Sequence, residues 1–126
     1  MTGSAGDALP TYRVRTICLG HMQVDHSQMV SERGFGQPVE IPTWTAAIEG
    51  HGHRILVDTG IADPEWVARV MVPCRVEPDE RLERAVGQLG WSLSSVDIVI
   101  NTHFDHDHCA NNSLLPNARF YVQSAE

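Results

Sequence analysis

The hydrophobic pattern of the first sixty residues is that of strands. β-Branched and aromatic residues dominate positions 12–19, and a glycine turn at 50–52 separates two further apolar stretches at 43–48 and 54–58. These stretches predict three strands, the last two joined as a hairpin. The intervening residues 20–42 contain Gly34, Gly36, Pro38 and Pro42, which predicts a long extended loop.

The pattern then changes to a helical one. Asp63 followed by Pro64 is a helix N-cap and first-turn pair, which predicts a short helix to about residue 72. Its apolar positions, expected in the core, are Trp66, Val67 and Val70. A second amphipathic helix is predicted from residue 79 to Gly90, because its apolar residues recur at 82, 85, 86 and 89. A buried strand at 97–100, a polar loop at 101–112 and a strand at 120–123 complete an α/β pattern.

Composition narrows the class of protein. The chain has 126 residues, 42% hydrophobic and 20% charged, which suits one globular domain at 12–126 behind a flexible leader at 1–11. A net charge of −7 and the absence of lysine argue against a nucleic-acid partner, and no apolar run is long enough for a membrane span. Three cysteines without CxxC spacing favour a reducing, cytoplasmic location over a disulfide framework.

The chemistry is concentrated in residues 103–108, where five of six positions are His or Asp. The cluster directly follows a buried strand, at the sheet edge where α/β proteins bind ligands. Imidazole with carboxylate suits divalent zinc, manganese, iron or cobalt better than calcium. His103 and Asp105 are two apart and point the same way if the backbone is extended, so they could share one metal ion. Asp107 and His108 could reach a second ion.

These residues resemble a known family. THFDHDH at 102–108 is similar to the THxHxDH motif of the metallo-β-lactamase superfamily, and WTAAIEGHGHRILVDTGI at 44–61 resembles its early hairpin ending in DTG. Residues 81–101 resemble the helix and strand that precede its metal loop. Within the superfamily, Asp25-His26-Ser27, Ile41-Pro42-x-Trp44 and Tyr121-Val122-Gln123-x-x-Glu126 look most like N-acyl-homoserine lactonases.

The resemblance implies an αββα sandwich, of which this chain is about the N-terminal half. It implies two divalent metal ions, zinc first among the candidates, held by His103, Asp105, Asp107 and His108. Asp107 would also pass a proton to the leaving alkoxide, and Asp58 would support the metal loop from beneath. The implied reaction is lactone ring opening by a metal-bound hydroxide that attacks the carbonyl, the activity called quorum quenching. β-Lactam or thioester hydrolysis is the close variant.

The sequence departs from the family pattern in two places. Asp105 stands where the family has its middle histidine, and His106 occupies a position that the family does not use as a ligand. A register in which His106 coordinates stays open. The eighteen residues after His108 contain no His or Asp, so further ligands must come from a missing C-terminal half or a second chain. Alternatives are a homodimer, or a non-catalytic half-domain that binds a metal or a partner.

Overall fold

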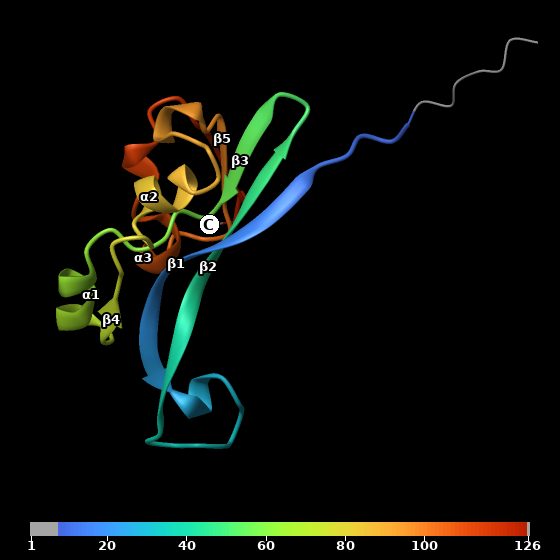
Figure 1. The fold of residues 1–126 in the computed structure, drawn as a ribbon. Helices are drawn as coiled ribbons and strands as arrows, with labels where there is room; N and C mark the ends of the chain where they lie inside the picture. The colour runs from blue at the N-terminus through green and yellow to red at the C-terminus, as the bar shows by residue number, and fades with distance from the viewer. Residues whose placement is uncertain (1–7, 126) are drawn as a thin grey trace, which may run out of the picture.

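The computed structural model describes residues 8–125, in which six strands form one mixed sheet with the helices gathered on one side (Figure 1). Most of the predicted leader, and the Glu126 of the closing motif, lie outside the described residues. The strands are β1 (Arg13–Asp25), β2 (Pro38–Gly50), β3 (His53–Val57), β4 (Cys74–Arg75), β5 (Ile98–Asn101) and β6 (Arg119–Val122). Their order across the sheet is β4-β1-β2-β3-β5-β6.

The sheet changes from antiparallel to parallel in its middle. β1 pairs antiparallel with β4 and β2, and β2 with β3, whereas β3, β5 and β6 run parallel. The predicted hairpin across the 50–52 turn is therefore confirmed, as are the strands near 97–100 and 120–123. The parallel pair of β3 and β5 brings the ends of both strands to the same edge, and this edge carries the candidate site.

The long loop predicted at 20–42 is wrong. β1 continues to Asp25 and β2 starts at Pro38, so a long antiparallel hairpin extends beyond the rest of the sheet (Figure 1). The prolines were misleading because β2 pairs with β3 only from Ala46 onward. Before that residue one side of β2 is an edge, where a residue without an N–H costs no ladder hydrogen bond.

The helices are short. They are α1 (Pro64–Val70), α2 (Leu82–Gly87) and α3 (His106–Cys109), with single 3-10 turns η1 (His26–Gln28), η2 (Leu93–Ser95) and η3 (Asn112–Leu114). Asp63 caps α1 as predicted, with its side chain accepting from Trp66 N at 2.9 Å. α2 ends three residues before Gly90, which has φ +78°. Within residues 8–125, no helix has the length and apolar character to cross a membrane.

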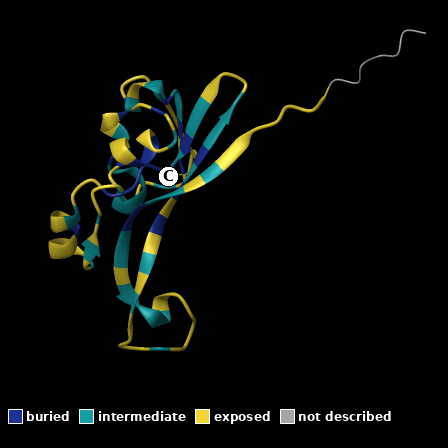
Figure 2. Cartoon of the chain, in the orientation of Figure 1, coloured by how far each residue is buried: buried dark blue, intermediate teal, exposed yellow. Residues whose placement is uncertain are grey.

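The core lies between α2 and the central strands, where buried residues gather in Figure 2. Its fully buried side chains come from both layers and include Leu19, Leu56, Val86, Val96 and Val99. The prediction that α1 contributes three core residues is wrong in part. Val67 is buried, but Trp66 and Val70 are 45% and 54% exposed, because α1 lies beside the sheet edge rather than over the core.

Candidate metal centre

The candidate site is built where β3 and β5 end side by side. After Val57 the backbone turns at Asp58, which has φ +71°, and Gly60, which has φ +78°. Asp58 N donates to Ile100 O at 2.9 Å, and Thr59 N donates to His108 O at 2.7 Å. These backbone bonds fix the DTG turn directly beneath the loop that carries the His and Asp cluster.

Asp58 is the centre of the hydrogen-bond network in this site. Its carboxylate accepts from Thr102 N at 2.8 Å and from Thr102 Oγ1 at 2.7 Å. The same carboxylate lies 2.8 Å from Nδ1 of His108. The Asp58 side chain is only 6% exposed, so it has lost most of its hydrogen bonds to water. The hydrogen bonds from these partners compensate for that loss. The structure thus places Asp58 in contact with the metal loop; its role in supporting a bound metal stays a prediction.

This network also determines which nitrogen of each histidine carries the proton. A carboxylate only accepts, so Nδ1 of His108 must be the donor toward Asp58. The Thr102 hydroxyl donates its proton to Asp58, so toward Nδ1 of His103, 2.8 Å away, it can only accept. In the neutral form of each imidazole the proton is therefore on Nδ1, and the lone pair is on Nε2.

The freed nitrogens face carboxylates. Nε2 of His108 is 3.2 Å from Asp107 Oδ2, and Nε2 of His103 is 3.3 Å from Asp105 Oδ2. The two rings are tilted against each other with centroids 4.2 Å apart. Donor atoms of His103, Asp107 and His108 all lie within 4.8 Å of one another. Asp105 is outside this group, and its side chain is 75% exposed.

His106 and Cys109 point to other surroundings. The His106 ring packs edge-on against Trp66, and its Nε2 is buried without a hydrogen-bond partner within residues 8–125. Cys109 Sγ contacts Phe104 O at 3.3 Å, and burial together with the nearby Asp58 charge raises the pKa of this thiol. Neither belongs to the cluster of His103, Asp107 and His108.

Three supporting residues escaped sequence reasoning. The motif gives Thr102 no role of its own, yet its hydroxyl joins Asp58 to His103. The buried Asn111 donates from Nδ2 to the carbonyls of Thr59 and Ile61, at 2.9 and 3.1 Å. Asn112 accepts from Thr59 Oγ1 at 3.0 Å. The signal in the sequence was the pair of asparagines at 111 and 112, three and four residues after His108.

The donor set fits divalent transition metals. Two imidazole nitrogens with free lone pairs and adjacent carboxylates are the mixed N/O ligands of zinc and related ions. Each histidine is also oriented through its other nitrogen, as metal-binding histidines usually are. The residues that would hold metal are therefore His103, Asp107 and His108, with Asp105 beside them.

Comparison with known proteins identifies the family. The model of the metallo-β-lactamase superfamily matches residues 39–126, which include both the DTG turn and the His and Asp loop. The chain belongs to the metallo-β-lactamase superfamily. Within it, the chain is similar to an N-acyl homoserine lactonase of a Bacillus species, 26% identical over 117 residues. That match covers 85% of this chain and 46% of the relative. A probable metallo-hydrolase of Methanocaldococcus jannaschii is 32% identical over 72 residues, covering 57% of this chain and 29% of the relative.

Solved structures of the superfamily share the fold. A crystal structure of a quorum-quenching N-acyl homoserine lactone lactonase superposes with a TM-score of 0.76 at 26% identity, covering 90% of this chain and 46% of that one. A variant of the Bacillus thuringiensis lactonase AiiA, with N-decanoyl-L-homoserine at its active site, gives a TM-score of 0.77 at 23% identity. That superposition covers 90% of this chain and 49% of that one.

The chain spans about half the length of the curated relatives it matches. The predicted metallo-β-lactamase fold is confirmed, and the half-length coverage is consistent with the predicted N-terminal half. The sheet, the DTG turn and the loop at 102–108 are thus the superfamily's features. That the metal ions are held by His103, Asp105, Asp107 and His108 remains a prediction for this chain.

Proposed function

We propose that this chain provides one half of a two-metal hydrolase centre, and that the complete domain opens the ring of N-acyl homoserine lactones. The observation that carries the proposal is the network from Asp58 through Thr102, which leaves Nε2 of His103 and of His108 free beside carboxylates. The lactonase relatives support the substrate class. A cytoplasmic location, predicted from the cysteines, belongs to the same proposal.

The residues of this chain have separate tasks. His103 and Asp105 would hold one ion and His108 the other, with Asp107 as a further ligand. When bound, the two divalent ions, Zn²⁺ first and Mn, Fe or Co as alternatives, supply an activated water and an electrophile for the carbonyl oxygen. Asp107 would also take up the proton that the attacking water loses and deliver it to the leaving alkoxide as the ring opens. Its side chain is 13% exposed and contacts His108, so its orientation is restrained while one side remains accessible.

The proposal includes a second half that supplies the remaining ligands, in the same protein or as another chain. A face suited to such a partner exists on the side of the sheet away from the helices. Neighbouring strands there present Val57, Ile100 and Tyr121 in one row, and Ile100 and Tyr121 are 39% and 48% exposed. Trp44, on the same face, is 56% exposed. Contiguous apolar surface of this kind is typical of an interface, so a homodimer would use the same face.

A second candidate is a half-domain that binds metal without turnover. It is favoured by the three-membered donor group, His103, Asp107 and His108, since two closed metal sites need more ligands. Hydrolysis of β-lactams or thioesters by the complete domain is a third possibility within the superfamily. These candidates are separated by measuring metal and turnover in the same preparations.

The test compares the 126-residue chain with a longer protein that adds the second half of the relatives' domain. Bound zinc is measured by elemental analysis, and ring opening of N-hexanoyl homoserine lactone by titration of the acid formed. We expect zinc in both proteins and turnover in the longer one. Zinc in both without turnover on any lactone, β-lactam or thioester favours the non-catalytic half-domain.

The site assignment is tested with a double variant of the chain, His103→Ala with His108→Ala. We expect it to lose the loop's zinc, because both nitrogen ligands are removed. The matched control is His51→Ala with His53→Ala, which removes another pair of histidines at the exposed β2–β3 turn. Unchanged zinc content in the first variant would contradict the assignment.

A further inference from the structure

A second cluster of side chains of metal-binding type lies near β1 and β4, at the opposite edge of the sheet from β5 and β6. Cys18 Sγ is 3.6 Å from Glu80 Oε1 and 3.8 Å from His21 Nε2. His21 Nδ1 is 3.0 Å from the same Glu80 oxygen. One donor atom from each of the three residues lies within 4.8 Å of the others. None of these residues belongs to the loop at 102–108.

A bulge in β1 brings two of the three side chains to one face. Residues 18 and 21 are three apart, so in a regular strand they would point to opposite faces of the sheet. Here Cys18 pairs with Trp44 and His21 with Pro42, so Leu19 and Gly20 together lie opposite Thr43 alone. The extra residue reverses the alternation. Gly20 has φ +140°, and a Cβ at this position would lie 3.1 Å from Arg75 O.

The third side chain is held in place from behind. Glu80 is in the turn between β4 and α2, and its Oε2 accepts from Glu77 N at 2.9 Å. That bond leaves Oε1 directed at Cys18 and His21. Ligating carboxylates are commonly anchored through such a bond from their other oxygen. The side chains of His21 and Glu80 are 21% and 13% exposed, so the cluster is half-buried and still reachable.

His21 has a buried ring nitrogen that lies against a carboxylate without a hydrogen bond. Its Nδ1 makes no hydrogen bond within residues 8–125, although Glu80 Oε1 is 3.0 Å away. A buried imidazole nitrogen without a partner is costly unless something else satisfies it. A metal ion held by this nitrogen, the thiolate and the carboxylate would do so.

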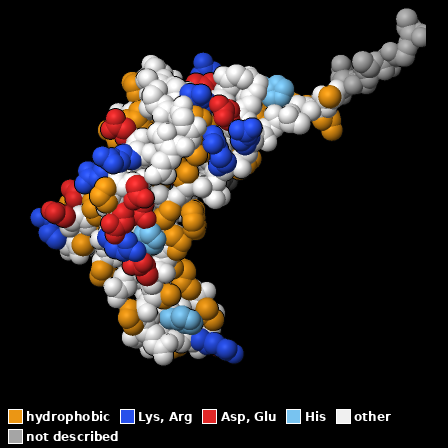
Figure 3. All heavy atoms as spheres, in the orientation of Figure 1, with side chains coloured by type: hydrophobic (Ala, Val, Ile, Leu, Met, Phe, Trp, Pro, Cys, Tyr) orange, Lys and Arg blue, Asp and Glu red, His pale blue; other side chains and the backbone are white. Residues whose placement is uncertain are grey.

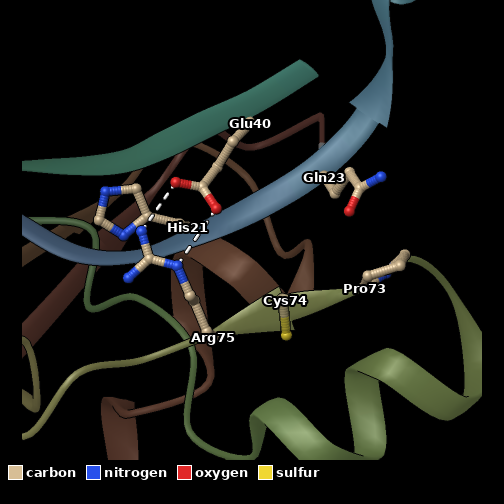
Figure 4. A pocket seen from close by; sticks show the side chains of 6 residues that line it. All are labelled: His21, Gln23, Glu40, Pro73, Cys74 and Arg75. Carbon is tan, nitrogen blue, oxygen red and sulfur yellow. Dashed lines mark hydrogen bonds and ion pairs between the residues drawn. The ribbon is translucent and has the colours of Figure 1, made fainter. Parts of the chain in front are cut away.

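The surrounding charge also suits a cation. Figure 4 shows His21 of β1 beside Arg75 of β4 and Glu40 of β2, along a pocket of about 130 Å³. Arg75 is paired with Glu40 at 2.7 Å and with Glu77 at 2.6 Å, so its charge is compensated by two carboxylates. Glu80 then adds an unbalanced negative charge. Figure 3 shows acidic and basic side chains mixed over this part of the molecule.

We propose that Cys18, His21 and Glu80 form a second metal site that binds a zinc-class divalent ion. Ideal zinc bond lengths place tetrahedral S, N and O donors roughly 3.3–3.6 Å apart, and Cys18 Sγ lies 3.6 Å from Glu80 Oε1 here, with a His21 nitrogen within 4.8 Å of both. Water fills the fourth position, since three protein ligands commonly leave it open. The ion joins the β1 bulge to the turn before α2, two segments separated by 62 residues.

Binding must displace a proton from sulfur. Burial raises the pKa of the Cys18 thiol, and the neighbouring Glu80 charge raises it further, so the free thiol is protonated at neutral pH. The ion binds the thiolate, and the proton leaves to solvent. No redox change takes part.

Co²⁺ is the probe, because a thiolate ligand gives it a charge-transfer absorption that imidazole and carboxylate do not. The double variant His103→Ala with His108→Ala removes the loop site from the measurement. We expect this variant of the 126-residue chain to bind one Co²⁺ with the thiolate band. Adding Cys18→Ser abolishes the band, and Glu80→Gln weakens Co²⁺ binding by about tenfold or more.

Matched controls are Glu40→Gln, which removes the same charge beside His21, and Cys109→Ser, which removes a thiol of similar exposure. Both should keep the band. If Cys18→Ser does not fold, the alkylation rates of the cysteines in the unaltered chain test the proposal instead. Zn²⁺ should slow the alkylation of Cys18 about tenfold and leave the alkylation rate of Cys74 unchanged. The proposal is overturned by no thiolate band at saturating Co²⁺, by a band that survives Cys18→Ser, or by equal alkylation rates with and without Zn²⁺.

Discussion

The Thr102 hydroxyl lies 2.7 Å from the Asp58 carboxylate, and this contact orients a histidine on the other side of it. With its proton given to Asp58, the hydroxyl accepts from His103 Nδ1. Asp58 accepts from His108 Nδ1 directly. One buried carboxylate therefore presents Nε2 of two histidines to the same space, which is the property on which the proposed metal site depends.

Thr102→Val should weaken metal binding at the loop by about 10-fold, because the isosteric methyl cannot accept from His103 Nδ1. Thr102→Ser is the matched control, since it keeps the hydroxyl and should retain most of the affinity. Zinc titration of both variants measures the difference. Equal affinity in the valine variant would show that the hydroxyl does not orient His103.

Asp58→Asn should weaken zinc binding more than Thr102→Val does, by about 10–100-fold, because the amide nitrogen cannot accept from His108 Nδ1. The control is Asp97→Asn, which removes a carboxylate paired with His53 at the far end of β3. We expect that control to bind zinc as the unaltered chain does. The measurement is competition for zinc against a chelator of known affinity.

Asp105→His should bind zinc at least as tightly as the unaltered chain. The substitution restores the superfamily motif and places a neutral nitrogen donor beside His103, at a position 75% exposed and free to adjust. Asp105→Ala should bind more weakly than either. A histidine variant that loses zinc would contradict the role of position 105 as a ligand.

Gly60→Ala should destabilise the fold, because the DTG turn requires a positive φ and close approach to the core. A Cβ there would lie 2.6 Å from the Cβ of the buried Leu19. Left-handed backbone costs roughly 1–2 kcal/mol, and overpacking adds about 1–3 kcal/mol. Gly36→Ala shares the positive φ but meets nothing within 4 Å, so it should show the backbone cost alone. Thermal unfolding of the two variants separates strain from overpacking.

The hairpin tip should loosen in acid. Hydrogen bonds from the Ser27 hydroxyl, Ser27 N and Gly36 N hold the pKa of Asp25 below its ordinary value of 3.8. A carboxyl with a lowered folded-state pKa stabilises the fold above its unfolded pKa, and that contribution is lost as pH falls through the folded pKa. The stability difference between the unaltered chain and Asp25→Asn should therefore shrink from about pH 6 to about pH 3. A difference that stays constant over this range would contradict the prediction.

Much of the candidate site could be predicted from sequence because its proposed ligands are neighbours in the chain. His103, Asp105, Asp107 and His108 fall within six residues after an apolar strand, so any fold that forms this strand places them on one loop. The start of α1 was equally local, because Asp63 and Pro64 act on the first turn of their own helix. His106 showed the limit of this reasoning, since nothing in the motif revealed that its ring packs against Trp66.

The sequence by itself determined the strands around the glycine turn, the capped helix and the density of ligands in the loop, because hydrogen bonding and hydrophobic periodicity within a few residues decide such features. The tertiary structure alone decided which distant residues meet. Asp58 contacts His108 because β3 and β5 pair in parallel. His21 joins Cys18 at Glu80 because a bulge between them reverses the direction of the following side chains and β4 pairs beside it. Strand order and register join residues fifty or more positions apart, and no local pattern in this chain encodes either of them.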